Sequence, residues 1–153
     1  HALIKITLFF CAGAVMVKTG RTQIEDLRGL SRVMPFTCAT YTIGAISLMG
    51  TPLLPGFVSK WLIGSAAIET GTAMGMVGVA AILISAVLTA IYLMGPALSM
   101  YFRPLEGMEK VVSCDPGWRM KLPFAVLAAV IVLCGLFSDP VITLLANLSA
   151  GVM

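Results

Sequence analysis

Charged side chains are scarce in this sequence. Only 11% of its 153 residues are charged and 59% are hydrophobic, whereas soluble domains carry about 25% charged and roughly 45–50% apolar residues. The mean hydropathy is +1.00. A chain this apolar has too little polar surface to cover a globule of its own residues, so a soluble globular domain is excluded and the expected solvent is lipid.

Metal-ligating residues are equally scarce. His1 is the only histidine, and no CxxC pair occurs among the four cysteines, which are Cys11, Cys38, Cys114 and Cys134. This composition gives no support to zinc, haem or iron–sulfur ligation. The sequence also lacks a Gly-rich phosphate loop and a Ser-His-Asp constellation. We therefore expect no catalytic centre, no metal and no cofactor in this chain.

The charges divide the chain into apolar runs that are long enough to cross a bilayer. A hydrocarbon core about 30 Å thick requires roughly 20 residues of apolar helix. The expected fold class is all-α, with a single polytopic transmembrane domain over residues 1–153. Its four spans are expected at about 1–17, 35–69, 74–101 and 122–137, followed by a short helix at 139–150. The first run has no basic region or cleavage motif, so we read it as the tail of a span rather than a signal peptide.

The second run is too long for one straight crossing and contains a helix-breaking segment. Residues 50–57 read Gly-Thr-Pro-Leu-Leu-Pro-Gly-Phe. Prolines remove amide donors from a helix, and glycines lower the free energy needed to unwind it. We expect a discontinuous span that is broken at 50–57 by Gly50, Pro52, Pro55 and Gly56.

Most basic residues fall in two connections between spans. Lys18, Arg21, Arg28 and Arg32 follow the first span, and Arg103, Lys110, Arg119 and Lys121 follow the third. The turn after the second span carries Glu69 and no base. The positive-inside rule then predicts a multi-pass protein of the cell membrane with both basic loops in the cytoplasm. Because the bases do not form one patch, the net charge of +3 does not indicate a nucleic-acid partner.

The two remaining bases, Lys5 and Lys60, lie inside apolar runs. A lysine in mid-bilayer costs at least about 2.5–3.5 kcal/mol, so such a residue is a candidate for function. We expect Lys60 on the first turn of the half-helix after the break, where burial and the positive end of the helix dipole disfavour the ammonium form. His1 and Lys5 are four residues apart and share a helical face. The alternatives are a Lys5 that extends to the interface and a Lys60 that only satisfies carbonyls at the break.

Small polar residues recur at helical spacing on two of the expected spans. They could line a path of waters, although such residues more often serve close helix packing. The candidates for a polar path are Thr40, Ser47, Thr51, Ser59, Ser85, Thr89 and Tyr92.

Several motifs in the first 70 residues occur in a characteristic order. The chain opens with His1-Ala2-Leu3-Ile4-Lys5, continues with the loop Ile24-Glu25-Asp26-Leu27-Arg28-Gly29-Leu30, and reaches Gly50-Thr51-Pro52-Leu53-Leu54-Pro55-Gly56-Phe57-Val58-Ser59-Lys60. This order resembles the antiporter-like membrane subunits of respiratory complex I and of the multi-subunit cation/proton antiporters of Mrp type. Among these, it is most similar to the D-type component of the Mrp antiporters.

The resemblance implies a subunit of about fourteen helices built from two inverted repeats, each with a broken helix that bears an ionisable residue. This chain looks like the C-terminal portion of such a subunit. Carried over by motif, Lys60 matches the broken-helix lysine, and His1 and Lys5 match residues of the preceding helix. The first repeat, with its own glutamate and lysine, has no counterpart here.

Two functions remain open from the sequence. The first is proton translocation through lysine and histidine relays, with or without coupling to Na+, as a subunit of a larger respiratory NADH dehydrogenase or cation antiporter complex. Its partners would be other membrane subunits, the lipid bilayer and the transported ions. The alternative is a non-conducting fragment whose role is helix packing and assembly in such a complex.

Overall fold

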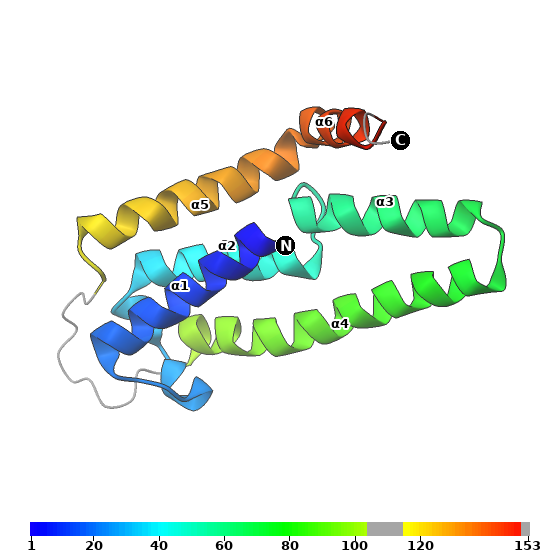
Figure 1. Cartoon of the computed structure of the whole chain (residues 1–153). Helices are drawn as coiled ribbons and strands as arrows, with labels where there is room; N and C mark the ends of the chain where they lie inside the picture. Colours follow the sequence, from blue (N-terminus) through cyan, green and yellow to red (C-terminus); the bar gives the residue numbers. More distant parts are fainter. Residues whose placement is uncertain (104–114, 151–153) are drawn as a thin grey trace.

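The computed structural model describes residues 1–103 and 115–150, and over these ranges the chain is all-helical, which confirms the expected fold class (Figure 1). The expected base Lys110 and the cysteine Cys114 lie outside the described residues. The helices are α1 (Ala2–Thr19), α2 (Pro35–Met49), α3 (Pro55–Glu69), α4 (Ala73–Phe102), α5 (Trp118–Leu136) and α6 (Ser138–Ala150). Two short 3-10 turns, η1 (Ile24–Leu27) and η2 (Leu30–Arg32), join α1 to α2.

Helices α2 and α3 follow one another end to end, and α4 runs back along both of them (Figure 1). At 1.5 Å per residue, the 30 residues of α4 extend about 45 Å, which equals the combined length of the two 15-residue helices. Helices α1 and α5 pack on α2. The chain is therefore a bundle around α2, with α3 and the first half of α4 extending from it as a hairpin.

The buried core surrounds α2 in two clusters. One lies near its N-terminus and comprises Val15, Leu30, Val33, Met34, Cys38 and Met100. The other lies near its C-terminus and comprises Ile4, Ala45, Leu48, Leu93 and Ile131. Most large apolar side chains on α3, α4 and α5 are exposed. Such exposure fits a protein whose outer surface meets lipid or other apolar helices.

Three described helices are long and apolar enough to cross a membrane: α1, α4 and α5. At about 22 Å each, α2 and α3 are individually shorter than a hydrocarbon core of about 30 Å. A fourth crossing, made by these two helices together, stays a prediction.

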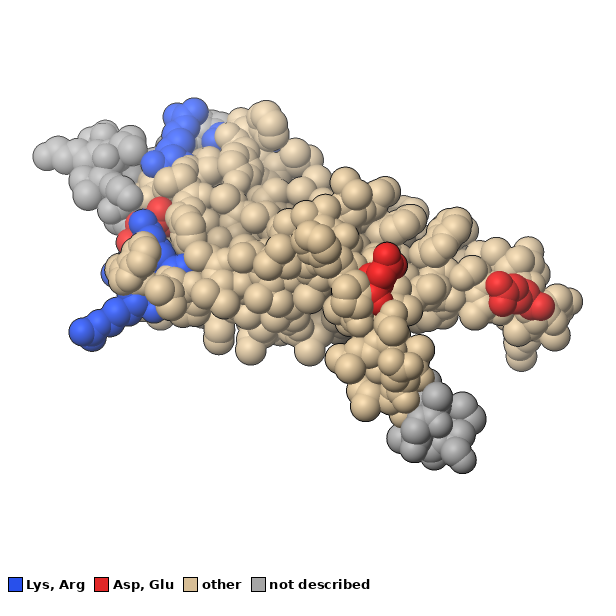
Figure 2. Space-filling view, turned by 90° about the horizontal axis from the view of Figure 1, so that it is seen from above, with Lys and Arg blue, Asp and Glu red and all other residues tan. Residues whose placement is uncertain are grey.

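Basic side chains are concentrated at one end of the molecule. On the face shown in Figure 2, the Lys and Arg side chains gather at this end, and the charged side chains visible over the rest of the face are Asp and Glu. That end contains the last turn of α1, the 3-10 turns and the start of α5. The described basic residues of the two connections therefore lie at one side of the bundle.

Some helix limits differ from the sequence-based prediction. Helix α5 begins at Trp118 rather than at about 122, because hydropathy marks the lipid-facing part of a helix and not its polar first turn. Pro55, Gly56 and Phe57 were expected inside the break, but they form the first turn of α3. Proline is favoured at this position, since its missing amide hydrogen has no partner there in any helix.

Candidate functional site

The interruption between α2 and α3 is a five-residue connection, residues 50–54, which we call the break. Gly50 ends α2 in the left-handed conformation, with φ 95°, and its amide donates to the carbonyl of Ser47 at 3.2 Å. Leu53 also has a positive φ, 73°, which is unusual for a residue with a branched side chain. The break is thus a defined turn with its own hydrogen bonds, and Leu54 donates to Thr51 at 3.3 Å.

Two glycines allow the surrounding helices to approach the break closely. A Cβ atom on Gly56 would overlap the carbonyl oxygen of Ser47, so the first turn of α3 lies directly against the last turn of α2. A Cβ atom on Gly135 of α5 would come within 2.6 Å of Leu54 Cα. The break therefore lies in close contact with α2, α3 and α5, although residues 51–53 remain exposed.

Lys60 links the two half-helices. Its ammonium group donates to the carbonyl oxygens of Leu48 at 3.1 Å and Met49 at 2.8 Å, both in the last turn of α2. It is the sixth residue of α3, so the prediction that it lies on the first turn was wrong. The side chain extends back past Gly50 to the C-terminal end of α2. At this end the dipole of α2 is negative and stabilises the ammonium group. The sequence instead predicts Lys60 at the positive end of the α3 dipole, which would disfavour the charge.

A groove runs from Lys60 between α3 and α4. Its volume is about 500 Å³, and its lining is mostly apolar. Lys60 contributes one of its few polar groups, with Ser65 and Glu69 further along α3. The sequence indicates only that Glu69 lies at a turn. Glu69 lines the same groove as Lys60 because α4 packs against α3, and no short sequence pattern predicts this packing.

His1 and Lys5 lie at the exposed start of α1. Helices α1 and α2 are antiparallel, because Ile4 shares a core cluster with Ala45 and Leu48. This pairing places the start of α1 at the level of the C-terminus of α2, where Lys60 binds. Among the described residues no side-chain hydrogen bond joins His1 or Lys5 to the Lys60 ammonium.

The candidates for a polar path do not form a continuous chain of hydrogen bonds in the described part of the structure. Thr40 and Thr89 donate to carbonyls four residues earlier in their own helices, those of Phe36 and Ser85. Thr51 and Ser59 also donate to nearby backbone carbonyls, and the side chains of Ser85 and Tyr92 are exposed on α4. Ser47 is fully buried beside the break, and its hydroxyl has no hydrogen-bond partner among the described residues.

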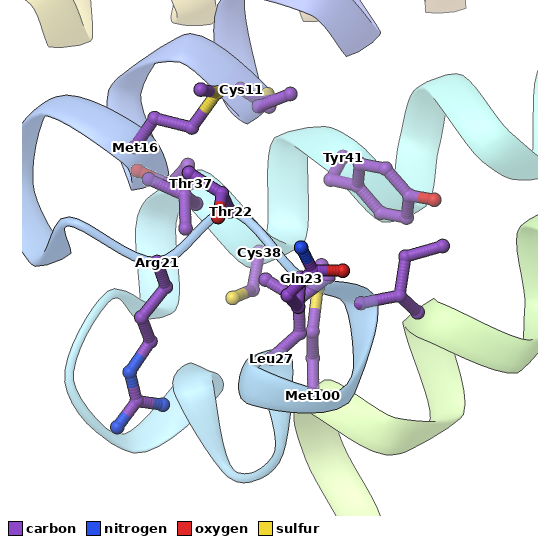
Figure 3. A pocket seen from close by; sticks show the side chains of 13 residues that line it. Cys11, Met16, Arg21, Thr22, Gln23, Leu27, Thr37, Cys38, Tyr41 and Met100 are labelled. Carbon is purple, nitrogen blue, oxygen red and sulfur yellow. The ribbon is translucent and has the colours of Figure 1, made fainter.

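A second cavity, of about 160 Å³, lies at the basic end of the bundle (Figure 3). It is formed by α1, η1, α2 and α4, and in Figure 3 the side chains of Arg21 and Tyr41 lie on opposite sides of it. The buried thiols of Cys11 and Cys38 contribute to its lining. It contains none of the predicted relay residues. We therefore take the break and Lys60 as the candidate functional site.

Comparison with known proteins assigns the chain to a family. Residues 1–89 match the model of the NADH:quinone oxidoreductase/Mrp antiporter transmembrane family. The chain belongs to this family. The matched region includes α1, both half-helices and the first half of α4, and so it contains the whole candidate site. The resemblance inferred from the sequence motifs is confirmed.

Individual relatives agree with this assignment. The chain is 33% identical to NADH-quinone oxidoreductase subunit N of Desulforudis audaxviator, over 94% of this chain and 30% of that protein. A chain of the Mrp complex from Dietzia sp. has the same fold, with a TM-score of 0.77 and 19% identity over 92% of this chain and 34% of that chain. A chain of respiratory complex I from Thermus thermophilus gives a TM-score of 0.67 and 24% identity, over 90% and 31% of the two chains. The chain thus spans about a third of these relatives' length, and it is a multi-pass membrane protein.

Proposed function

We propose that this chain carries part of a proton path in a multi-subunit membrane complex, with Lys60 as its titrating group. The observation that supports the proposal is the position of Lys60, whose ammonium bridges the two halves of an interrupted helix and lines a groove. An interrupted membrane helix exposes backbone carbonyls that stabilise ions or water in mid-membrane. A lysine at such a position exchanges its proton when a neighbouring charge moves.

His1 and Lys5 would extend this path along α1, because the start of that helix lies level with the Lys60 site. The other partners would be membrane subunits of an NADH dehydrogenase or cation antiporter complex, since the relatives are named as parts of such assemblies. Coupling to Na+ would require further oxygen ligands, because a lysine repels this ion. The proposed location is the cell membrane, with the basic end of the bundle in the cytoplasm.

A second function is favoured by the same contacts. Two carbonyls at 2.8 and 3.1 Å satisfy most of the hydrogen-bonding capacity of the Lys60 ammonium, so its role could be limited to joining α2 to α3. In that case the chain would serve packing and assembly in a complex without conducting protons. The two functions require different properties of the side chain at position 60.

Lys60→Arg separates these functions in the full-length subunit within its complex. A guanidinium keeps the positive charge and the donors that hold the carbonyls, but it does not release a proton in this range. We expect proton uptake into proteoliposomes to fall at least about a hundredfold, the lower end of what proton-transfer groups contribute, while complex assembly is unchanged. Lys60→Ala should abolish uptake as well.

Lys18→Ala is the matched control, because Lys18 is an exposed lysine in the last turn of α1. It should assemble and transport as the unmodified protein does. Normal proton uptake by the Lys60→Arg and Lys60→Ala complexes would contradict the relay and favour the assembly role.

A further inference from the structure

The N-terminus of α2 is held by a carboxylate that is distant in the sequence. Asp115 accepts hydrogen bonds from the amides of Phe36 at 3.2 Å and Thr37 at 3.4 Å, and from the Thr37 hydroxyl at 3.1 Å. Helix α2 has no side-chain cap of its own, since Met34 occupies its N-cap position. Asp115 therefore satisfies the first amides of α2 from 78 and 79 residues away.

This carboxylate is itself buried and paired. Its side chain is 5% exposed, and Lys121 in the first turn of α5 lies 3.7 Å from it. The Lys121 ammonium also lies over the ring of Phe36, at 5.7 Å from the ring centroid. An anion at a helix N-terminus is stabilised by the helix dipole. The Asp115 carboxylate is therefore stabilised both by the N-terminus of α2 and by the Lys121 ammonium.

The two ends of α2 thus contact charges of opposite sign. Asp115 binds the N-terminal amides, and Lys60 binds the C-terminal carbonyls of Leu48 and Met49. The region of α5 reaches both ends of α2. Asp115, just before α5, binds the N-terminus of α2, and Gly135, near the C-terminus of α5, packs on Leu54 in the break that follows α2. A helix of 15 residues, about 22 Å long, transmits a displacement of one end to the other because its backbone hydrogen bonds keep it rigid.

We propose that Asp115 is a positioning residue for Lys60. Its carboxylate fixes the N-terminus of α2 against the start of α5, so that the carbonyls at the other end of α2 stay in hydrogen-bonding distance of the ammonium. A displacement of Asp115 would then reach the Lys60 site through α2. The positioning itself is independent of transport, whereas its consequence for proton movement rests on the proposed function.

Hydrogen exchange of the full-length subunit tests this proposal without a transport assay. Asp115→Asn keeps the size of the side chain but removes its charge. We expect amide exchange in residues 46–54 to rise about tenfold, together with exchange in the first turn of α2, as expected when local opening becomes easier at both ends. Asp139→Asn is the control, because Asp139 is an exposed carboxylate in the first turn of α6; it should leave residues 46–54 unchanged.

Two further variants test the proposal if Asp115→Asn fails to fold. Thr37→Val removes one of the three hydrogen bonds to Asp115 and should raise exchange in residues 46–54 by about twofold, a smaller loss of the same kind. In the Lys60→Gln background, Asp115→Asn should add little at the break, because coupled residues are not additive. Increased exchange confined to the first turn of α2, or no increase, would overturn the proposal. If transport survives in Lys60→Arg while exchange responds to Asp115→Asn, only the proposed function fails.

Discussion

Substitution of Gly135 tests the close packing of α5 on the break. In Gly135→Ala, the new methyl group would lie 2.6 Å from Leu54 Cα and 3.0 Å from the carbonyl carbon of Leu53. Carbon atoms in contact are about 3.5–4.0 Å apart. Helix α5 would therefore have to move away by nearly 1 Å, or the break would have to rearrange. Both neighbours are backbone atoms and cannot rotate aside.

The expected change in stability follows from two opposing terms. Overpacking of a rigid contact costs about 3 kcal/mol at the upper end of its usual range. Replacing glycine by alanine inside a helix gains about 1 kcal/mol. We expect Gly135→Ala to lower the free energy of unfolding of the full-length subunit by about 2 kcal/mol, measured by denaturant titration in detergent micelles.

Gly78→Ala provides the matched control. Gly78 lies inside α4, and a Cβ atom there would have no atom of the described residues within 4 Å. This variant should gain up to about 1 kcal/mol, so the two substitutions should differ by about 3 kcal/mol and in sign. Equal stability of the two variants would show that α5 does not pack on the break as described.

Two further predictions concern the break and the topology. Leu53→Gly should stabilise the subunit by up to about 1 kcal/mol in the same titration, because it relieves a left-handed leucine whose side chain is 71% exposed; a loss of stability would mean that this side chain packs elsewhere in the complex. In a full-length subunit without other cysteines, Arg28→Cys should react with a membrane-impermeant maleimide only from the cytoplasmic face, and Glu69→Cys only from the opposite face. Reaction of both from one face would contradict the topology.

Local chemistry in the sequence carries much of the information about the helices. Low charge and long apolar runs predict an all-helical membrane protein, because a backbone in lipid must satisfy its own hydrogen bonds. The prolines and glycines at 50–57 predict an interruption there, and the helices on either side end at Met49 and begin at Pro55. These features depend only on residues that are close together in the chain, so a single sequence is enough to predict them.

The details of the site depend on contacts that a single sequence does not encode in any short pattern. Lys60 could be identified as an unusual residue, but the carbonyls that it binds belong to the turn before the break. Asp115 is 79 residues from Phe36, and hydrophobic periodicity gives no reason to pair them. The exposed positions of Ser85 and Tyr92 depend on the rotation of α4 about its axis, which is set by packing with α2 and α3.

The contacts of Lys60 define what a proton relay at this site requires. When the lysine loses its proton, its neutral amine keeps two N–H donors for the carbonyls of Leu48 and Met49, but it loses the charge that strengthens both hydrogen bonds. Release of the proton therefore needs a nearby acceptor such as water. The adjacent groove of about 500 Å³ provides room for water, and the Ser47 hydroxyl, which has no hydrogen-bond partner among the described residues, lies in the same turn. Hydration of this groove, rather than the lysine alone, would decide whether the site conducts protons or only joins two helices.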